Sequence, residues 1–179
     1  GKSDATSAWF HQRIGPDDRF IDYMEWTGAD IDEIAKAVKA SGYNLGRHYM
    51  PHDVEHDILG FGNRTRKQMF EAAGIKPITV VPRIRHLHEG IEMTRQRFAS
   101  YWFDEQRCGR GLECLSSYAY ERSDALNDLR PEPAHNWASH AADALRQHAQ
   151  GFRKGKGFDE PVARQRVPIT ATRSTTWIV

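Results

Sequence analysis

Two aspartates occur where their carboxylates could hold a divalent metal ion, and the first is Asp53. It follows Gly46–Pro51, a run that predicts a short strand. A carboxylate at the C-terminal end of a strand projects to the rim of the sheet, where sites in open sheets tend to form. Hard cations such as Mg²⁺ prefer such oxygens. A turn residue after Pro51 is an equally simple explanation of this aspartate, because aspartate is common in turns.

The second aspartate is Asp143, in a predicted helix over residues 137–150. Ala142 and Ala144 flank it, so the helix backbone can approach a sheet closely and direct the carboxylate into the interface. A buried carboxylate must be paired, protonated or bound to metal. A salt bridge to a nearby arginine is the competing interpretation. Asp4, in the segment GKSDAT, is a candidate third carboxylate or a turn residue.

Histidines and cysteines give a weaker signal for zinc. Three histidines recur every four residues, but Pro51 interrupts a continuous helix there. Two others have strand-like spacing without an accompanying cysteine, and the two cysteines lack a second pair, so structural zinc is not favoured. These residues are His48, His52 and His56, then His86 and His88, then Cys108 and Cys114.

A glycine-rich loop and the basic residues after it suggest phosphate contacts rather than nucleotide hydrolysis. The loop at 60–63 lacks the pattern of a P-loop. Arg64, Arg66 and Lys67 follow it and open a predicted helix, where guanidinium groups and backbone amides could contact DNA phosphates. A solvated basic first turn explains the same residues.

Charge is unevenly distributed along the 179 residues, whose formal net charge is +1. Residues 1–60 carry eleven acids against six bases, residues 61–110 carry ten bases against five acids, and residues 111–179 carry nine bases against eight acids. An acidic part beside a basic part suits a metal site flanked by a phosphate-binding surface. No apolar run approaches a membrane span, and two cysteines fit a reducing, cytosolic setting.

Hydrophobic periodicity and turn signals predict an α/β fold with a mixed sheet. Residues 1–150 are expected to form the domain, and residues 151–179 a basic C-terminal tail with little core of its own. A hairpin opens the domain around Gly15-Pro16, and Asp30 with Glu33 has the spacing of a capping box. The expected strands are 6–14, 19–26, 46–51 and 77–84. The expected helices are 30–40, 64–73, 89–103, 112–120 and 137–150, and 128–135 is expected to be a loop.

Several segments together resemble the nuclease domain of the phage terminase large subunit. They are MPHDVEHD, GFGNRTRKQMFEAAG, the long stretch from GIEMTRQRFASYWFDEQRC to the Gly-Leu that follows, and HNWASHAADALR. The last segment is the most specific, with Asn136 where the family usually has aspartate. The resemblance covers roughly residues 1–150 in order.

The resemblance implies an RNase H-like fold, a central mixed sheet flanked by helices, with its central first strand truncated or missing here. It implies a metal-dependent endonuclease that cuts concatemeric double-stranded viral DNA by two-metal hydrolysis with Mg²⁺ or Mn²⁺. Asp53 and Asp143 match two metal ligands, and Asp4 matches a nearby secondary acid. His52, Ser139 and His140 would lie in the outer sphere of the metal site.

The same resemblance places the first catalytic aspartate upstream of Gly1, so we expect the 179 residues alone to be inactive or nearly so. It implies an N-terminal packaging ATPase domain, a small terminase subunit and a portal as partners in the host cytoplasm, and no membrane. The alternatives are another RNase H-like nuclease, of resolvase or transposase type, and a non-catalytic module that docks on DNA or the portal.

Overall fold

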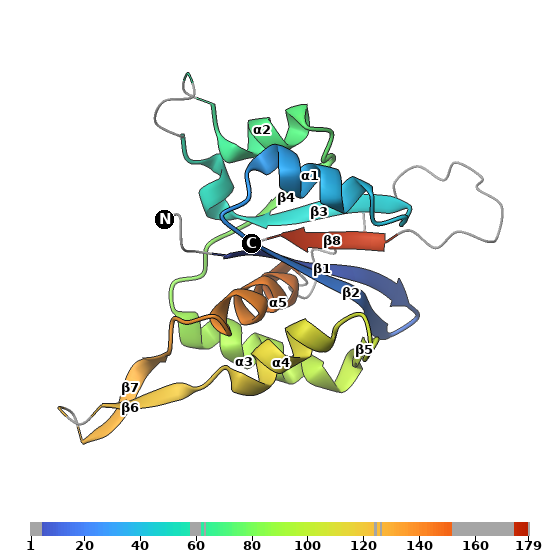
Figure 1. Cartoon of the computed structure of the whole chain (residues 1–179). Helices are drawn as coiled ribbons and strands as arrows, with labels where there is room; N and C mark the ends of the chain where they lie inside the picture. Colours follow the sequence, from blue (N-terminus) through green and yellow to red (C-terminus); the bar gives the residue numbers. More distant parts are fainter. Residues whose placement is uncertain are drawn as a thin grey trace.

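A six-stranded mixed sheet forms the centre of the protein in a computed structural model that describes residues 5–57, 62, 64–123, 125, 127–151 and 174–178. The strand order is β4-β3-β8-β1-β2-β5, and β6 and β7 form a separate hairpin (Figure 1). The strands are β1 (Ala5–Ile14), β2 (Asp17–Thr27), β3 (Leu45–Pro51), β4 (Ile78–Val81), β5 (Tyr101–Phe103), β6 (Tyr120–Ser123), β7 (Asp128–Pro133) and β8 (Ser174–Ile178). The helices are α1 (Ile31–Lys39), α2 (Arg66–Ala72), α3 (Leu87–Arg97), α4 (Gly109–Ser117) and α5 (Ser139–Gly151), with short 3-10 helices η1 (His52–Glu55) and η2 (Phe98–Ser100).

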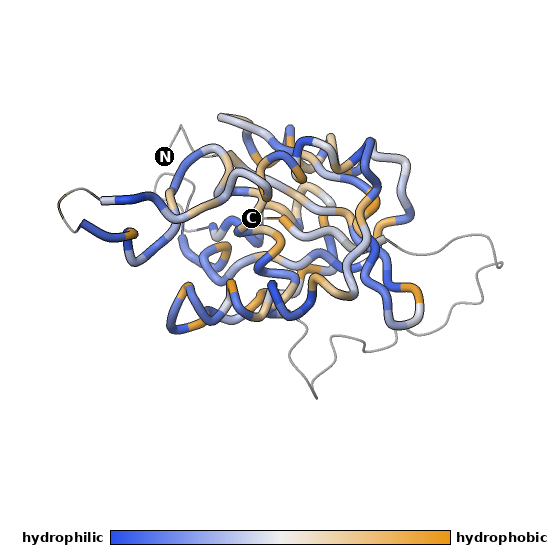
Figure 2. The backbone as a smooth tube through the Cα atoms, turned by 90° about the horizontal axis from the view of Figure 1, so that it is seen from below, coloured by the Kyte–Doolittle hydropathy of each residue, from blue (hydrophilic) through white to orange (hydrophobic). Residues whose placement is uncertain are grey.

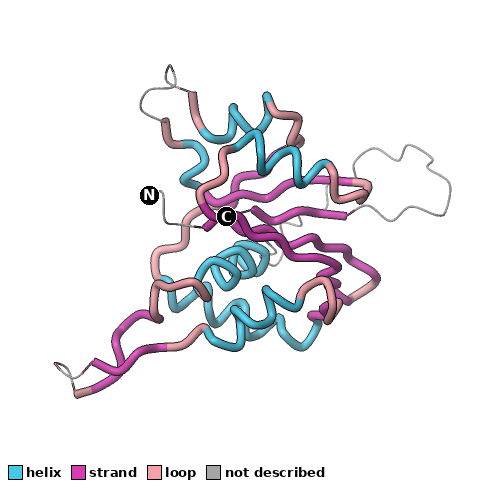
Figure 3. The backbone as a smooth tube through the Cα atoms, viewed as in Figure 1, coloured by secondary structure: helices cyan, strands magenta, loops and turns pink. Residues whose placement is uncertain are grey.

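Helices cover both faces of this sheet, as Figure 3 shows. Alternation along β1 builds one core on each side: Trp9 packs toward the α5 face, whereas Ala8 and Phe10 pack toward α1 and α2. Hydrophobic residues accordingly concentrate in the layered body, while the outlying β6–β7 hairpin is mainly hydrophilic (Figure 2). The predicted α/β class, with a mixed sheet flanked by helices, is confirmed.

Local sequence signals account for the first elements. β1 and β2 pair antiparallel around Gly15, whose φ of 61° suits the tight connection. Asp30 and Glu33 form the expected capping box at the start of α1, and the helix buries Ile34, Ala35 and Val38. The predicted hairpin and first helix are therefore confirmed.

The predicted long helix over 89–103 is wrong at its C-terminal end. α3 stops at Arg97, and Tyr101–Phe103 forms the edge strand β5, parallel to β2. The hydroxyl of Tyr101 is hydrogen-bonded to Nδ1 of buried His148, 2.8 Å away. This tertiary contact, with the pairing to β2, outweighs a helical pattern in the local sequence.

The segment expected to be a proline-rich loop is the second strand of a hairpin. β7 pairs antiparallel with β6, and the predicted helix over 112–120 runs instead from Gly109 to Ser117. Leu129, on β7, is 57% exposed. The prolines are compatible with a strand here because β7 pairs on one side only and lies at an edge.

Residues 174–178, near the end of the expected C-terminal tail, belong to the central sheet, which corrects the prediction for this segment. Ser174–Ile178 forms β8, antiparallel to β1 and parallel to β3. β8 therefore lies in the interior of the sheet, between β3 and β1. Trp177 is fully buried and stacks on Tyr49 with ring centroids 3.9 Å apart. Residues 152–173 lie outside the described residues.

His48 of β3 makes the stability of the fold sensitive to acid. Its side chain is 2% exposed, and burial lowers its pKa to about 4. Because the unfolded chain binds this proton more readily, stability present above pH 6.5 should decline as the pH falls toward 4, by about 3 kcal/mol.

We expect His48→Gln to flatten this part of the stability profile. Urea unfolding at pH 7, 6, 5 and 4.5 would measure it, with the exposed His88→Gln as the control. Equal pH slopes for wild type and His48→Gln would contradict the assignment.

Candidate functional site

The C-terminal end of β3 and the start of α5 lie at the same rim of the sheet, where β3 ends and β1 begins. Ala8 of β1 pairs with Ile178, and Tyr49 of β3 pairs with Trp177. The last residues of β3 are therefore level with the first residues of β1, two strands or roughly 10 Å away. At that level the backbone N–H of Ala5 donates to Nε2 of His140, 3.4 Å away. Both segments appear on the left of Figure 1.

Asp143, one turn after His140 in α5, has basic side chains as neighbours. Its side chain is 25% exposed, and Oδ1 lies 2.9 Å from Nη1 of Arg146. Burial raises the pKa of Asp143, while the charges of Arg146, His135 and His140 act to lower it. The salt bridge that competed with metal binding in the sequence interpretation is thus present, and the two imidazoles favour an ionised carboxylate.

Asp53 is the first-turn acid of η1, directly after β3. Its Oδ2 lies 3.9 Å from Nη1 of Arg66 across an exposed pair. Its Oδ1 is withdrawn from solvent and has no hydrogen-bond partner in the described part of the chain. A buried carboxylate oxygen without a donor is costly unless a cation satisfies it, so this atom fits a metal ligand.

The residues expected around the metal have separate local roles. The ring of His52 lies near that of His56, with centroids 6.0 Å apart. Ser139 is buried and its hydroxyl donates to the carbonyl of Asn136, which helps to start α5. His140 contacts the start of β1 through Nε2, and its carbonyl accepts from the hydroxyl of Ser7. His140, one of the residues expected in the outer sphere, is therefore hydrogen-bonded to β1 at the rim of the sheet.

Two of the three basic residues expected to contact DNA lie beside acids of η1. Arg64 precedes α2 and is exposed. Arg66 pairs with Asp53, and Nζ of Lys67 lies 3.4 Å from Oε1 of Glu55. Each of these two bases is therefore paired with an acid of η1.

Sequence reasoning missed His135, Arg146 and Tyr118 around Asp143. All three interact electrostatically with the carboxylate. The distance between Asp53 and Asp143 stays a prediction of 4–8 Å, the range a shared metal site requires. Asp4 lies outside the described residues.

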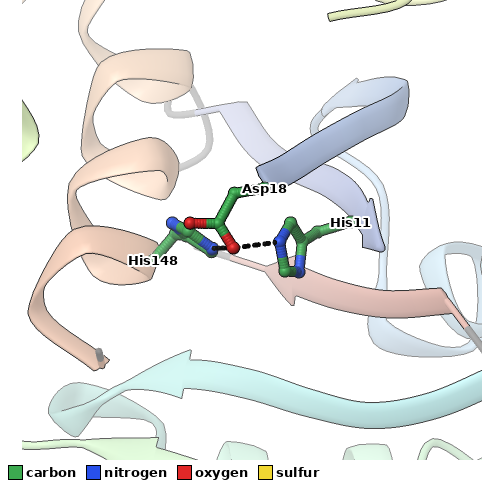
Figure 4. A group of neighbouring side chains, drawn as sticks. All are labelled: His11, Asp18 and His148. Atoms are coloured by element: carbon green, nitrogen blue, oxygen red, sulfur yellow. Dashed lines mark hydrogen bonds and ion pairs between the residues drawn. The ribbon is translucent and has the colours of Figure 1, made fainter. Parts of the chain in front are cut away.

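A second group of possible metal ligands lies away from this rim, and the sequence did not predict it. His11 of β1, Asp18 of β2 and His148 of α5 are all at most 2% exposed. One ligand atom from each lies within 4.8 Å of the others. Figure 4 shows the carboxylate of Asp18 between the two imidazoles. Asp18 follows Gly15-Pro16 and reads as a turn residue, so local sequence gives no signal for this cluster.

The electrostatics of this cluster hold His148 neutral. Its pKa is lowered well below the usual value by burial, and further by the positive charges of His11, Arg97 and Arg13. Asp18 accepts from Nε2 of His11 at 2.9 Å and lies 3.6 Å from Nη1 of Arg97. Inside the core, the cluster therefore contains the neutral imidazole of His148 and the carboxylate of Asp18, whose charge is balanced by Arg97.

Within the described ranges, no helix is long and apolar enough to cross a membrane. Comparison with known proteins found no matching family model, no matching curated protein and no matching solved structure.

Proposed function

We propose that this chain is the nuclease domain of a DNA-packaging terminase large subunit of phage type, cutting double-stranded DNA with divalent metal ions. The observation that carries the proposal is that the C-terminal end of β3, which leads into Asp53, and His140, three residues before Asp143 in α5, lie at the same rim of the sheet. The orphaned Oδ1 of Asp53 supports metal binding there. The sequence resemblance supplies the substrate class.

In this proposal Asp53 and Asp143 hold the metal, assisted by Asp4. When bound, two Mg²⁺ or Mn²⁺ ions would activate a water and stabilise the leaving 3′ oxygen. His140 and His135 act electrostatically on Asp143, and Arg146 holds its carboxylate in place at 2.9 Å. His52 and Ser139 support the outer sphere of the site.

Arg64, Arg66 and Lys67 are proposed to bind the DNA backbone. A machine that cuts packaged DNA needs little base specificity, so phosphate contacts dominate. The proposed partners are the packaging ATPase domain of the same protein, the small terminase subunit and the portal, in the host cytoplasm. A resolvase-type nuclease would differ by cutting branched DNA selectively, and a docking module would bind DNA without cutting it.

Plasmid nicking with Mg²⁺ or Mn²⁺ tests the proposal. A longer chain that includes the further carboxylate implied by the resemblance should nick supercoiled plasmid without sequence preference. DNA binding without cleavage by the longer chain would overturn the nuclease assignment in favour of a docking module.

We expect DNA binding by the 179-residue chain to be weak and dependent on salt. Contacts from Arg64, Arg66 and Lys67 alone predict a loss of roughly 40-fold in affinity between 50 and 200 mM salt. Replacing all three by alanine should remove most of this dependence in a fluorescence-anisotropy titration.

Three exposed arginines outside α2 provide a charge-matched control: Arg83, Arg85 and Arg95, also replaced by alanine. The control should keep the wild-type salt slope. An affinity that does not change with salt would argue against phosphate binding by this segment. A control that behaves like the variant of Arg64, Arg66 and Lys67 would argue against it too.

A further inference from the structure

We infer that His11, Asp18 and His148 form a zinc-binding site, separate from the proposed nuclease site. Three elements bring these residues together: β1, β2 and α5. The ligand set of two imidazoles and one carboxylate suits Zn²⁺ better than Mg²⁺, which prefers oxygen ligands.

All three ligand atoms lie within 4.8 Å of one another, and two of the three distances are close to those of a tetrahedral site. Oδ1 of Asp18 lies 2.9 Å from Nε2 of His11 and 3.8 Å from Nε2 of His148. Zinc bonds of 2.0–2.1 Å at tetrahedral angles separate ligand atoms by about 3.3 Å. Small side-chain rotations therefore suffice to place all three atoms around one ion.

The surrounding groups orient the ligands as partners of a metal site commonly do. Oδ1 of Asp18 faces both imidazoles, while Oδ2 faces Nη1 of Arg97 at 3.6 Å. The other ring nitrogen of His148, Nδ1, is hydrogen-bonded to the Tyr101 hydroxyl at 2.8 Å. Such bonds fix the ring orientation and tautomer of a ligating histidine.

Arg97 also limits the affinity of the site, because its positive charge opposes a dication. The site is therefore expected to bind zinc more weakly than a four-ligand zinc finger does. A solvent molecule would have to complete the coordination. The zinc would tie the β1–β2 hairpin to the second half of α5. Its role is to stabilise the fold, and it leaves Asp53 and Asp143 free for the proposed nuclease.

Zinc binding to the full 179-residue chain, first freed of metal with a chelator, tests the inference. Isothermal titration should give one equivalent of Zn²⁺ per chain. Free Zn²⁺ at 100 times its Kd should raise the Tm by roughly 5–10 °C. Co²⁺ in place of Zn²⁺ should give the visible absorption of a low-coordinate site.

Two substitutions separate this cluster from other histidines. His148→Gln should abolish the binding, whereas the double variant His86→Gln, His88→Gln should keep it, because those two exposed histidines have the spacing of an adventitious site. Asp53→Asn and Asp143→Asn should also keep it, so failure of the zinc site and failure of the nuclease proposal are distinguishable.

X-ray absorption of the zinc-loaded wild type keeps the inference testable if His148→Gln does not fold. A first shell of nitrogen and oxygen with two imidazoles is expected. Absence of zinc binding, loss of binding in the His86, His88 variant, or a shell containing sulfur would overturn the inference and leave the cluster as a buried ion network.

Discussion

Asp143→Asn is expected to reduce metal-dependent plasmid nicking by at least about 100-fold in the longer chain that includes the further carboxylate implied by the resemblance. Loss of an outer-sphere partner of a metal already costs roughly 10–100-fold, and this change removes a direct ligand and its charge. Asp53→Asn should have a similar effect, because it removes the negative charge of the second proposed ligand and one of its two oxygens. A gel assay of supercoiled plasmid with Mg²⁺ or Mn²⁺ measures both variants.

The fold should survive these substitutions. The amide keeps the shape of the Asp143 carboxyl, and its oxygen can still accept from Arg146, so we expect the substitution to be tolerated. Asp32→Asn, an exposed acid in the first turn of α1 on the other face of the sheet, is the matched control and should cut at the wild-type rate. Circular dichroism verifies folding. Wild-type cleavage by folded Asp143→Asn would show that Asp143 is not a metal ligand.

The elements predicted correctly are those whose signals are local. The β1–β2 hairpin follows from the turn at Gly15, and α1 follows from its capping box. β3 ends where Pro51 and the polar residues after it predict. Each of these features depends on contacts between residues close in the sequence, which periodicity and turn chemistry report directly.

The elements predicted wrongly are those that depend on distant partners. Tyr101–Phe103 becomes a strand through β2 and through His148, which lies 47 residues beyond Tyr101. Ser174–Ile178 is short and rich in Ser and Thr, and only its place between β1 and β3 makes it a strand. Because a strand can be stabilised entirely by neighbours that are remote in the chain, the local pattern did not predict either one.

In the candidate site too, the features that are local in the sequence could be predicted, and the contacts between distant residues could not. Asp53 and Asp143 were found because a strand end and an alanine-flanked helix position are local features. Their ion pairs with Arg66 and Arg146 appear only in the structure. The buried cluster of His11, Asp18 and His148 could not be found from sequence, since its members belong to three elements and each one alone resembles an ordinary polar residue.

Trp177→Ala is expected to destabilise the protein by about 3–5 kcal/mol, the usual effect of truncating a buried aromatic residue to alanine. Trp177 is fully buried, stacks on Tyr49 and meets the ring of His148 edge-on at 4.8 Å. The loss would lower the Tm by roughly 6–20 °C. Thermal unfolding followed by near-ultraviolet circular dichroism would measure the change.

Trp102→Ala is the matched control, because Trp102 is 60% exposed on the edge strand β5. The change there should be within about 0.5 kcal/mol, as for most surface substitutions. A Trp177→Phe variant should recover part of the stability, since it keeps an aromatic ring opposite Tyr49. If Trp177→Ala unfolds at the wild-type temperature, β8 does not contribute to the core in the way that the structure shows.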